Sequence, residues 1–471
     1  MLVFDLFIFL GLALLGTFFI SGRDVFFLKN YALAVFSVLF LYSILLLFLN
    51  NYYSFFEVLS FDIIPIQNFF YVVGLDTVSV SFIVLSQFLF MLCILSSFSS
   101  INFNYKLFVI IMILIDFFLV NLFSVLDIFF FYICFESILV PMFLLIGIWG
   151  TRQRRIHAGL QFFFYTLFGS FFMLAAITIL YSHFGTTNIC LLNLASLSEE
   201  RQLFVWFCFF LAFSIKIPMF PFHIWLPEAH VEAPTIGSVI LAGILLKLGG
   251  YGFFRFVIPL VPFANYYFTP FIFALSTLAI LYTSLTAIRQ VDLKKIIAYA
   301  SVSHMNFVVL GLFSFSSLGL LGSIFLMLSH GIVSSGLFFA VGVLYERYHT
   351  RLLKYYGGLA YTMPLFSILF FLLILANFSF PGTSNFIGEF LVLAGMLSQN
   401  LLCTFFALIS IVFTVVYSIW SYNRMFFGFV NSKSLLFFSD VSVREFLILF
   451  SCVICSIIFG IFPNLIIHKL E

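Results

Sequence analysis

Charged residues are scarce in this sequence: 8% of its 471 residues are Asp, Glu, Lys or Arg, whereas 64% are hydrophobic. Soluble domains carry about 25% charged residues, because their surfaces must be solvated. The scarcity excludes a soluble protein and predicts a polytopic membrane protein. A net charge of +2 over this length provides no basic stripe, so nucleic-acid binding is not expected.

Ligands for redox cofactors are also missing. Zinc and iron–sulfur sites need about four ligands, whereas the seven cysteines are scattered and the closest pair, Cys452 and Cys455, lies in an apolar run. The sequence contains no glycine-rich dinucleotide fingerprint. We therefore expect no metal and no bound cofactor in this chain.

Long apolar runs fill most of the sequence. A helix crosses a bilayer with about 20 apolar residues, and unbroken runs of this length exclude alternating barrel strands. We predict an all-α fold with about 14 transmembrane helices, at residues 2–20, 31–49, 75–98, 107–123, 127–149, 158–182, 203–221, 236–259, 269–288, 294–313, 317–345, 363–379 continuing as 383–400, 402–427 and 446–466. The amphipathic stretch 222–235 contains Trp225 and predicts an interfacial segment.

Basic residues are distributed unevenly among the predicted loops. The loops after odd-numbered spans hold 15 of the 20 Lys and Arg: Arg23, Lys29, Lys106, Arg152, Arg154, Arg155, Arg289, Lys294, Lys295, Arg347, Arg351, Lys354, Arg424, Lys433 and Arg444. Loops rich in Lys and Arg stay on the side from which a membrane protein inserts. In a mitochondrion these loops would face the matrix, and both termini would face the intermembrane space.

Ionisable residues inside the predicted spans indicate a function. A Lys or Asp at mid-membrane costs roughly 3 kcal/mol, so such residues are rare unless they pair or conduct. Six spans contain one each: Glu136, Lys216, Lys247, His304, His330 and Glu389. This pattern predicts a proton or ion path. The structural alternatives are a partner role for Glu136, snorkelling lysines and hydrogen-bonded core histidines.

Two predicted helices are broken beside ionisable residues. Pro218 and Pro221 follow Lys216 and deprive helical carbonyls of their partners, and Pro381 with Gly382 interrupts the twelfth span before Glu389. Discontinuous helices of this kind form the sites of secondary transporters. Because the breaks lie five spans apart, we predict two inverted five-helix repeats. The predicted division is 1–106 for helices 1–3, 107–259 for the first repeat, 260–428 for the second, and 429–471 for a loop and helix 14.

The chemistry predicted for the first break is electrostatic. A carboxylate stabilises a charged lysine by roughly 2.8 kcal/mol at about 6 Å and an effective dielectric near 20. A change in the distance between Glu136 and Lys216 would therefore change how tightly Lys216 holds its proton. Lys247, the two histidines and Glu389 would carry the proton onward through water.

Several longer motifs are characteristic of a known family. They are FESILVPMFLL, HAGLQFFFYTLFGS, FSIKIPMFPFHIWLPEAHVEAPT, GILLKLGGYG, LKKIIAYASVSHMNF, LSHGIVSSGLFFAVGVLYERYHTR and TSNFIGEFL, between about residues 127 and 428. The chain resembles the antiporter-like, proton-pumping subunits of respiratory complex I. Its end at Glu471, soon after the last predicted span, leaves no room for an extended lateral helix and favours the subunit 4 branch over a longer paralogue. The residues around the breaks favour that branch over a shorter one.

The resemblance implies a role for each site residue. It implies that Glu136 and Lys216 form a coupling pair, Lys247 is the central proton site, His304 and His330 are relay residues, and Glu389 is the terminal proton site. It also implies a membrane-arm subunit that couples NADH oxidation and ubiquinone reduction to proton pumping across the mitochondrial inner membrane. Flavin, iron–sulfur clusters and quinone would lie elsewhere in the complex. The expected partners are neighbouring antiporter-like subunits, membrane lipids and protons.

Other functions remain open at this point. A stand-alone sodium/proton antiporter subunit would share the same motifs. A haem-bearing membrane oxidoreductase could use His304 and His330 as axial ligands, but it would leave Lys216, Lys247 and the broken helices unexplained. A structural scaffold would not need so many costly buried charges.

Overall fold

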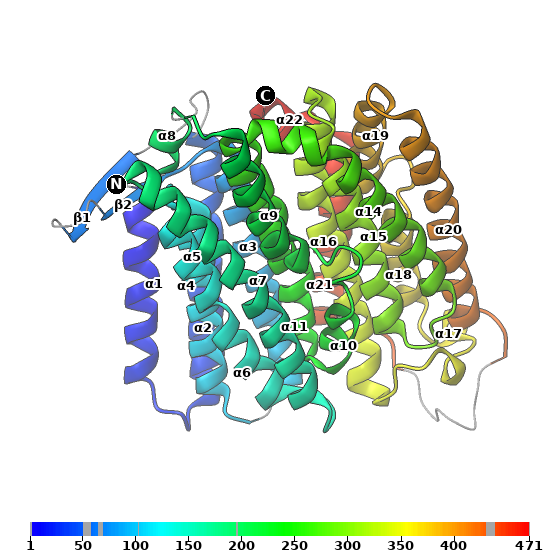
Figure 1. Cartoon of the computed structure of the whole chain (residues 1–471). Helices are drawn as coiled ribbons and strands as arrows, with labels where there is room; N and C mark the ends of the chain where they lie inside the picture. Colours follow the sequence, from blue (N-terminus) through cyan, green and yellow to red (C-terminus); the bar gives the residue numbers. More distant parts are fainter. Residues whose placement is uncertain are drawn as a thin grey trace. The chain divides into compact units, whose positions relative to one another are not determined.

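The computed structural model describes residues 2–49, 58–64, 69–101, 103–194, 196–429 and 439–470, most of them in helices. The chain divides into two compact units. Figure 1 colours the chain along its sequence, from blue at the N-terminus to red at the C-terminus. Unit 1 comprises Met1–Lys216 and Leu248–Thr269, and unit 2 comprises Ile217–Lys247 and Pro270–Glu471. The helices α12 (Leu246–Gly252) and α14 (Pro262–Ile288) each continue from one unit into the other.

Unit 1 is built mainly from helices with apolar sequences. Besides parts of α12 and α14 it contains α1 (Leu2–Phe19), α2 (Val25–Leu49), α3 (Thr77–Ser100), α4 (Tyr105–Ser124), α5 (Ile128–Ser137), α6 (Leu139–Trp149), α7 (Arg155–Phe184), α8 (Ile189–Leu192), α9 (Glu199–Lys216), η2 (Phe253–Val257) and α13 (Ile258–Leu260). Asp76 caps α3 by accepting a hydrogen bond from the Ser79 N–H at 2.8 Å. The same carboxylate accepts from Arg255 Nη1 at 2.8 Å, so this ion pair fixes α3 against η2.

A β-hairpin in unit 1 corrects the all-α prediction. Strands β1 (Val58–Ile64) and β2 (Phe69–Gly74) pair antiparallel, with Val58 opposite Gly74. The hairpin lies between the predicted spans 31–49 and 75–98, in residues 50–74, where no helix was expected. Its β-branched and aromatic residues favour strands, and it is too short to span a bilayer as a helix. Residues 50–57 and 65–68 of that stretch, and the predicted loop residue Lys433, lie outside the described residues.

Unit 2 surrounds one long buried helix, α16 (Ser317–Tyr348). Besides parts of α12 and α14, unit 2 also contains α10 (Trp225–Glu232), α11 (Thr235–Ile240), η1 (Leu241–Leu245), α15 (Leu293–Phe313), η3 (Leu353–Tyr355), α17 (Leu359–Thr362), α18 (Pro364–Asn377), α19 (Ser384–Leu397), α20 (Leu401–Phe426), α21 (Val443–Ile461) and α22 (Asn464–Leu470). Glycine allows α19 to approach α16 closely, because a Cβ on Gly388 would lie 2.8 Å from the Leu326 Cβ. This approach sets the depth of the neighbouring Glu389.

Eleven helical runs in the described part of the chain are long and apolar enough to cross a membrane. The chain is therefore a multi-pass membrane protein. The other three predicted spans correspond to α1, to α9 and to the pair α18 and α19, whose apolar parts are shorter or more polar. The count of 14 stays a prediction.

Several boundaries differ from those predicted. The span 127–149 is interrupted at Ile138, between α5 and α6, because Pro141 has no N–H to give to the Ser137 carbonyl. The span 236–259 contains two π-helical turns, η1 and η2. The segment 222–235, predicted to be interfacial, packs into the protein: Trp225 and His230 are buried, and the His230 ring stacks on Phe338 with centroids 4.6 Å apart. Its place at a membrane interface stays a prediction.

Both predicted interruptions coincide with non-helical segments. Helix α9 ends at Lys216 and α10 begins at Trp225, so Pro218 and Pro221 lie between helices. Helix α18 ends at Asn377 and α19 begins at Ser384, with Pro381 and Gly382 between them. Gly382 has φ 96°, a conformation that glycine adopts without steric cost.

Candidate functional site: two buried groups of ionisable residues

Lys216 ends α9 in an aromatic environment inside unit 1. Its side chain is buried, and Nζ has no hydrogen-bond acceptor within the described part of the chain. The ammonium lies 4.5 Å from the Phe135 ring centroid and 5.8 Å from that of Phe162. Ring faces stabilise a cation but do not replace water fully. The surroundings therefore leave the charge on Lys216 sensitive to any carboxylate nearby.

Glu136 provides that carboxylate from α5. It is half-buried, one residue after Phe135, and lies within electrostatic range of Lys216. No salt bridge joins the two side chains in the region that the structure covers. The helix is interrupted two residues later, at Ile138. Unit 1 thus contains the predicted pair in a separated arrangement, beside an irregular helical turn.

Lys247 is held deep inside unit 2. It is fully buried, and its Nζ donates to the Ala242 carbonyl in the π-helical turn η1. A wider π turn leaves backbone carbonyls without regular α-helical partners, which makes them accessible to side chains. Nζ also lies 2.9 Å from His330 Nδ1 on α16. When Lys247 is charged it can only donate, so Nδ1 then accepts and the proton of a neutral His330 is on Nε2.

His304 and Glu389 form the next contact of this group. His304 Nδ1 on α15 lies 2.7 Å from Glu389 Oε1 on α19, and both side chains are buried. The His304 and His330 rings are 5.4 Å apart, centroid to centroid. The Nε2 atoms of both rings are buried without partners among the described residues. In unit 2, therefore, Lys247 contacts His330, the His330 ring lies beside the His304 ring, and His304 contacts Glu389. We call this connected series of four side chains the unit 2 chain.

Several buried polar atoms lie around the second helix break, close in sequence to Glu389 of the unit 2 chain. Ser379 Oγ, Ser384 Oγ and both amide atoms of Asn385 are buried without hydrogen-bond partners among the described residues. Asn385 precedes Glu389 by one helical turn on α19. An unpaired buried polar group costs about 1–3 kcal/mol, and water is its usual partner. The break is therefore suited to hold water next to Glu389.

A further buried group was missed by sequence reasoning. Lys294 and Arg351 were assigned to basic loops, yet both are fully buried in unit 2. Lys294 Nζ donates to the Ala233 carbonyl at 2.9 Å, Arg351 Nη1 donates to the Val231 carbonyl, and Arg351 Nη2 lies 3.7 Å from Glu232. These contacts fix the C-terminal end of α10. The motif HVEAPT contains the buried acid Glu232, but its amphipathic sequence predicted an interfacial segment.

Metal ligation finds little support in the described residues, which contain no group of three or more His, Cys, Asp or Glu side chains able to hold a metal ion. The absence of a cofactor from this chain stays a prediction.

A multi-pass helical protein with connected ionisable residues in its interior defines the class of ion-translocating membrane proteins. The family model described as "NADH:quinone oxidoreductase/Mrp antiporter, TM" matches residues 125–414. The chain belongs to this family, within the group of NADH-ubiquinone oxidoreductase chain 4 proteins. The family inferred from the motifs is thereby confirmed.

Particular relatives agree with this membership. The chain is 56% identical to NADH-ubiquinone oxidoreductase chain 4 of Acanthamoeba castellanii, over 86% of this chain and 82% of the relative. It is similar to a chain in the structure of respiratory complex I from Thermus thermophilus with bound NADH. The TM-score is 0.90, the identity is 29%, and the match covers 100% of this chain and 97% of that chain. A chain of the Mrp complex from Dietzia sp. DQ12-45-1b shares the fold. The TM-score is 0.88, the identity is 18%, and the match covers 100% of this chain and 96% of that chain.

Proposed function

We propose that this protein is the proton-translocating membrane-arm subunit 4 of respiratory complex I, the enzyme that couples NADH oxidation and ubiquinone reduction to proton pumping. Its membership of the chain 4 group carries the proposal. The subunit acts within a multi-subunit membrane complex, as its structural relatives do. A stand-alone sodium/proton antiporter is less well supported, because the likeness to the Mrp complex is one of fold. Family membership likewise gives no support to a haem protein or a scaffold.

The finer organisation belongs to the same proposal. It comprises 14 spans, two inverted five-helix repeats divided at about residues 107, 260 and 429, and neighbouring antiporter-like subunits as partners. Its location is the mitochondrial inner membrane, with both termini on the intermembrane-space side. Flavin, iron–sulfur clusters and quinone lie in other subunits. The basic loops and the two helix breaks support this organisation.

The unit 2 chain moves a proton by successive transfers in this proposal. Lys247 gives a proton from Nζ to His330 Nδ1, and His330 then releases its own proton from Nε2. A water molecule passes it to Nε2 of His304, whose Nδ1 proton moves to Glu389. Each imidazole gains a proton on one nitrogen and loses one from the other. Lys247 ends neutral and Glu389 ends protonated, so one charge has moved.

The Glu136–Lys216 pair controls this transfer in the proposal. The two side chains interact electrostatically without a salt bridge, so their attraction depends on distance. A closer approach would stabilise the charged Lys216, and separation would release its proton. The aromatic rings of Phe135 and Phe162 hold the lysine in place while the carboxylate moves. Roles for Pro218, Pro221, Pro381 and Gly382 follow, because helix breaks provide carbonyls and space for water.

Proton pumping by the assembled complex tests the proposal. We expect Lys216→Ala and Glu136→Ala to leave the complex assembled but to lower NADH-driven acidification in proteoliposomes. Lys354→Ala is the matched control, because that lysine is exposed outside the spans. Undiminished pumping in either site variant would overturn the assigned roles. Isolation of the native chain without flavin and iron–sulfur subunits would overturn the assignment to complex I.

A further inference from the structure

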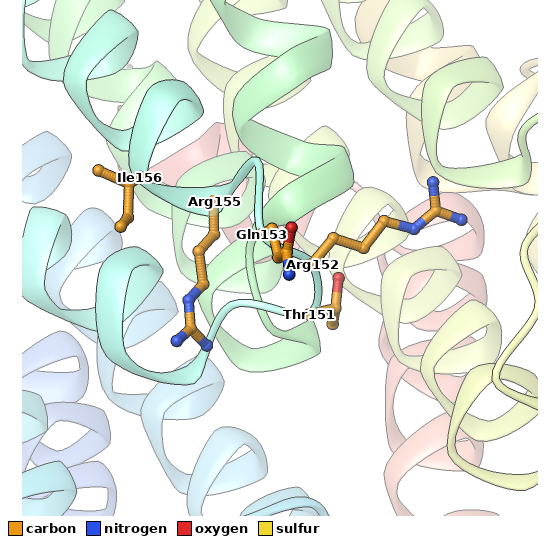
Figure 2. A pocket seen from close by; sticks show the side chains of 5 residues that line it. All are labelled: Thr151, Arg152, Gln153, Arg155 and Ile156. Atoms are coloured by element: carbon orange, nitrogen blue, oxygen red, sulfur yellow. The ribbon is translucent and has the colours of Figure 1, made fainter.

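A pocket of about 560 Å³ lies between α6 and α7 in unit 1, outside both groups of proton-site residues. Figure 2 shows its lining: Thr151, Arg152, Gln153, Arg155 and Ile156. The side chains of Arg152 and Arg155 extend to opposite sides of the loop in Figure 2, so one guanidinium binds a phosphate directly and the other attracts it from a distance. Anionic headgroups are bound in basic pockets next to transmembrane helices.

The cations of this pocket form no ion pair with the residues that the structure describes. The sequence has no Asp or Glu between Glu136 and Glu199. No salt bridge in the described part of the chain involves Arg152, Arg154 or Arg155. Other cations do have acidic partners: Lys295 pairs with Glu228, and Arg347 with Glu445. The charge at 152–155 is therefore available to an external anion.

Arg155 is preorganised for such a ligand. Its Nη1 donates to the Ile148 carbonyl at 3.1 Å and to the Gly150 carbonyl at 2.9 Å, which fixes the guanidinium against the end of α6. Other N–H groups of the planar guanidinium can bind a phosphate. Helix α7 begins at Arg155 without a side-chain cap on its first N–H groups, which adds a favourable field for an anion.

An apolar track begins at the same pocket. Ile156 lines the pocket, and α7 continues with Leu160, Phe164 and Phe168 at intervals of four residues, which places them on one face. All four side chains are exposed, between 38% and 61%. A free phosphate would make no use of this track. An acyl chain would bury it while its headgroup occupies the pocket.

We infer that residues 151–156 bind the headgroup of an anionic phospholipid, with an acyl chain along Ile156, Leu160, Phe164 and Phe168 of α7. The site is independent of the proton path and does not require the proposed function. It fixes one lipid to a defined place on the subunit rather than attracting anionic lipids generally. The loop joining α6 to α7 is then a lipid-binding element.

Photo-cross-linking of the whole complex tests this site. The complex is placed in phosphatidylcholine nanodiscs doped with a diazirine-bearing phosphatidylglycerol or phosphatidylcholine, and the labelled peptides are mapped. We expect the phosphatidylglycerol probe to label peptides from the 151–168 region preferentially. Loss of one basic residue lowers attraction to anionic lipid by about fivefold, so Arg152→Gln should reduce labelling by about that factor. Arg201→Gln, an exposed arginine on α9, is the control and should leave it unchanged.

Further outcomes separate the possible ligands. Phe164→Ser should also reduce labelling, because it removes part of the apolar track without changing charge. Equal labelling by both probes, or unchanged labelling in Arg152→Gln, would overturn the site. Displacement of the probe by inorganic phosphate would show an anion site without acyl recognition. Cross-linking of this loop to an acidic segment of a neighbouring subunit would assign it to protein contact instead.

Discussion

Gly388 offers a test of the unit 2 chain that leaves every ionisable group in place. In Gly388→Ala the added methyl would lie 2.8 Å from Leu326 Cβ and 2.9 Å from Leu326 Cα, on the backbone of α16. Carbon atoms pack at about 3.5–4.0 Å. Helix α19 must therefore move away from α16 by roughly 1 Å, and Glu389 moves with it.

The expected loss of proton pumping can be calculated from the hydrogen bond that this displacement stretches. His304 Nδ1 and Glu389 Oε1 are 2.7 Å apart, and a shift of roughly 1 Å takes them beyond hydrogen-bonding distance. A hydrogen bond to a charged group contributes about 1.5–3 kcal/mol, which corresponds to about a 10- to 100-fold change in an equilibrium. We expect NADH-driven proton pumping to fall by at least the lower of these factors.

The assay measures NADH-driven acidification in proteoliposomes. The rate is divided by the amount of assembled complex, which is measured on native gels. Gly147→Ala is the matched control, because a Cβ at this helical glycine meets no atom within 4 Å. Wild-type pumping in Gly388→Ala would refute the argument that close helix packing positions Glu389. An equal loss in Gly147→Ala would refute it as well, since the effect would then be general to helical glycines.

Three further predictions concern other parts of the molecule. Asn385→Leu should slow coupled turnover, measured as NADH-driven acidification, because an apolar side chain excludes water beside Glu389; full activity would contradict a hydrated break. Asp76→Asn should lower the thermal stability of the complex by about 3 kcal/mol, since it keeps the α3 cap but removes the carboxylate charge from the ion pair with the largely buried Arg255; an unchanged melting temperature would contradict this. Asp127→Ala should lower the stability of the complex by about 1 kcal/mol in calorimetry, because Asp127 caps α5 by accepting from the Phe129 N–H at 2.8 Å and also accepts from the Thr187 hydroxyl at 2.7 Å; an unchanged melting temperature would contradict this role.

Sequence patterns identified the helical framework because each membrane span requires a continuous run of apolar residues. Apolar runs marked the long helices, and prolines marked the segments 217–224 and 378–383 where helices end. The six ionisable residues stood out because charge is costly in an apolar run. Each of these features depends on residues close together in the chain.

Other features depended on contacts that local patterns do not encode. Lys294 and Arg351 looked like loop cations, but carbonyls at the end of α10 and the Glu232 carboxylate bind them in the interior. The π-helical turn that supplies the Ala242 carbonyl to Lys247 has no residue signature of its own. Pairings such as His304 with Glu389, 85 residues apart, arise only when α15 and α19 pack together.

The most direct test of the central claim is the number of protons pumped per NADH oxidised in a complex carrying Glu389→Gln. Glutamine keeps the shape of the side chain and can still accept from His304, but it cannot take up a proton. The unit 2 chain predicts a lower proton-to-NADH ratio than in the wild type. An unchanged ratio at normal turnover would show that protons do not pass through Glu389.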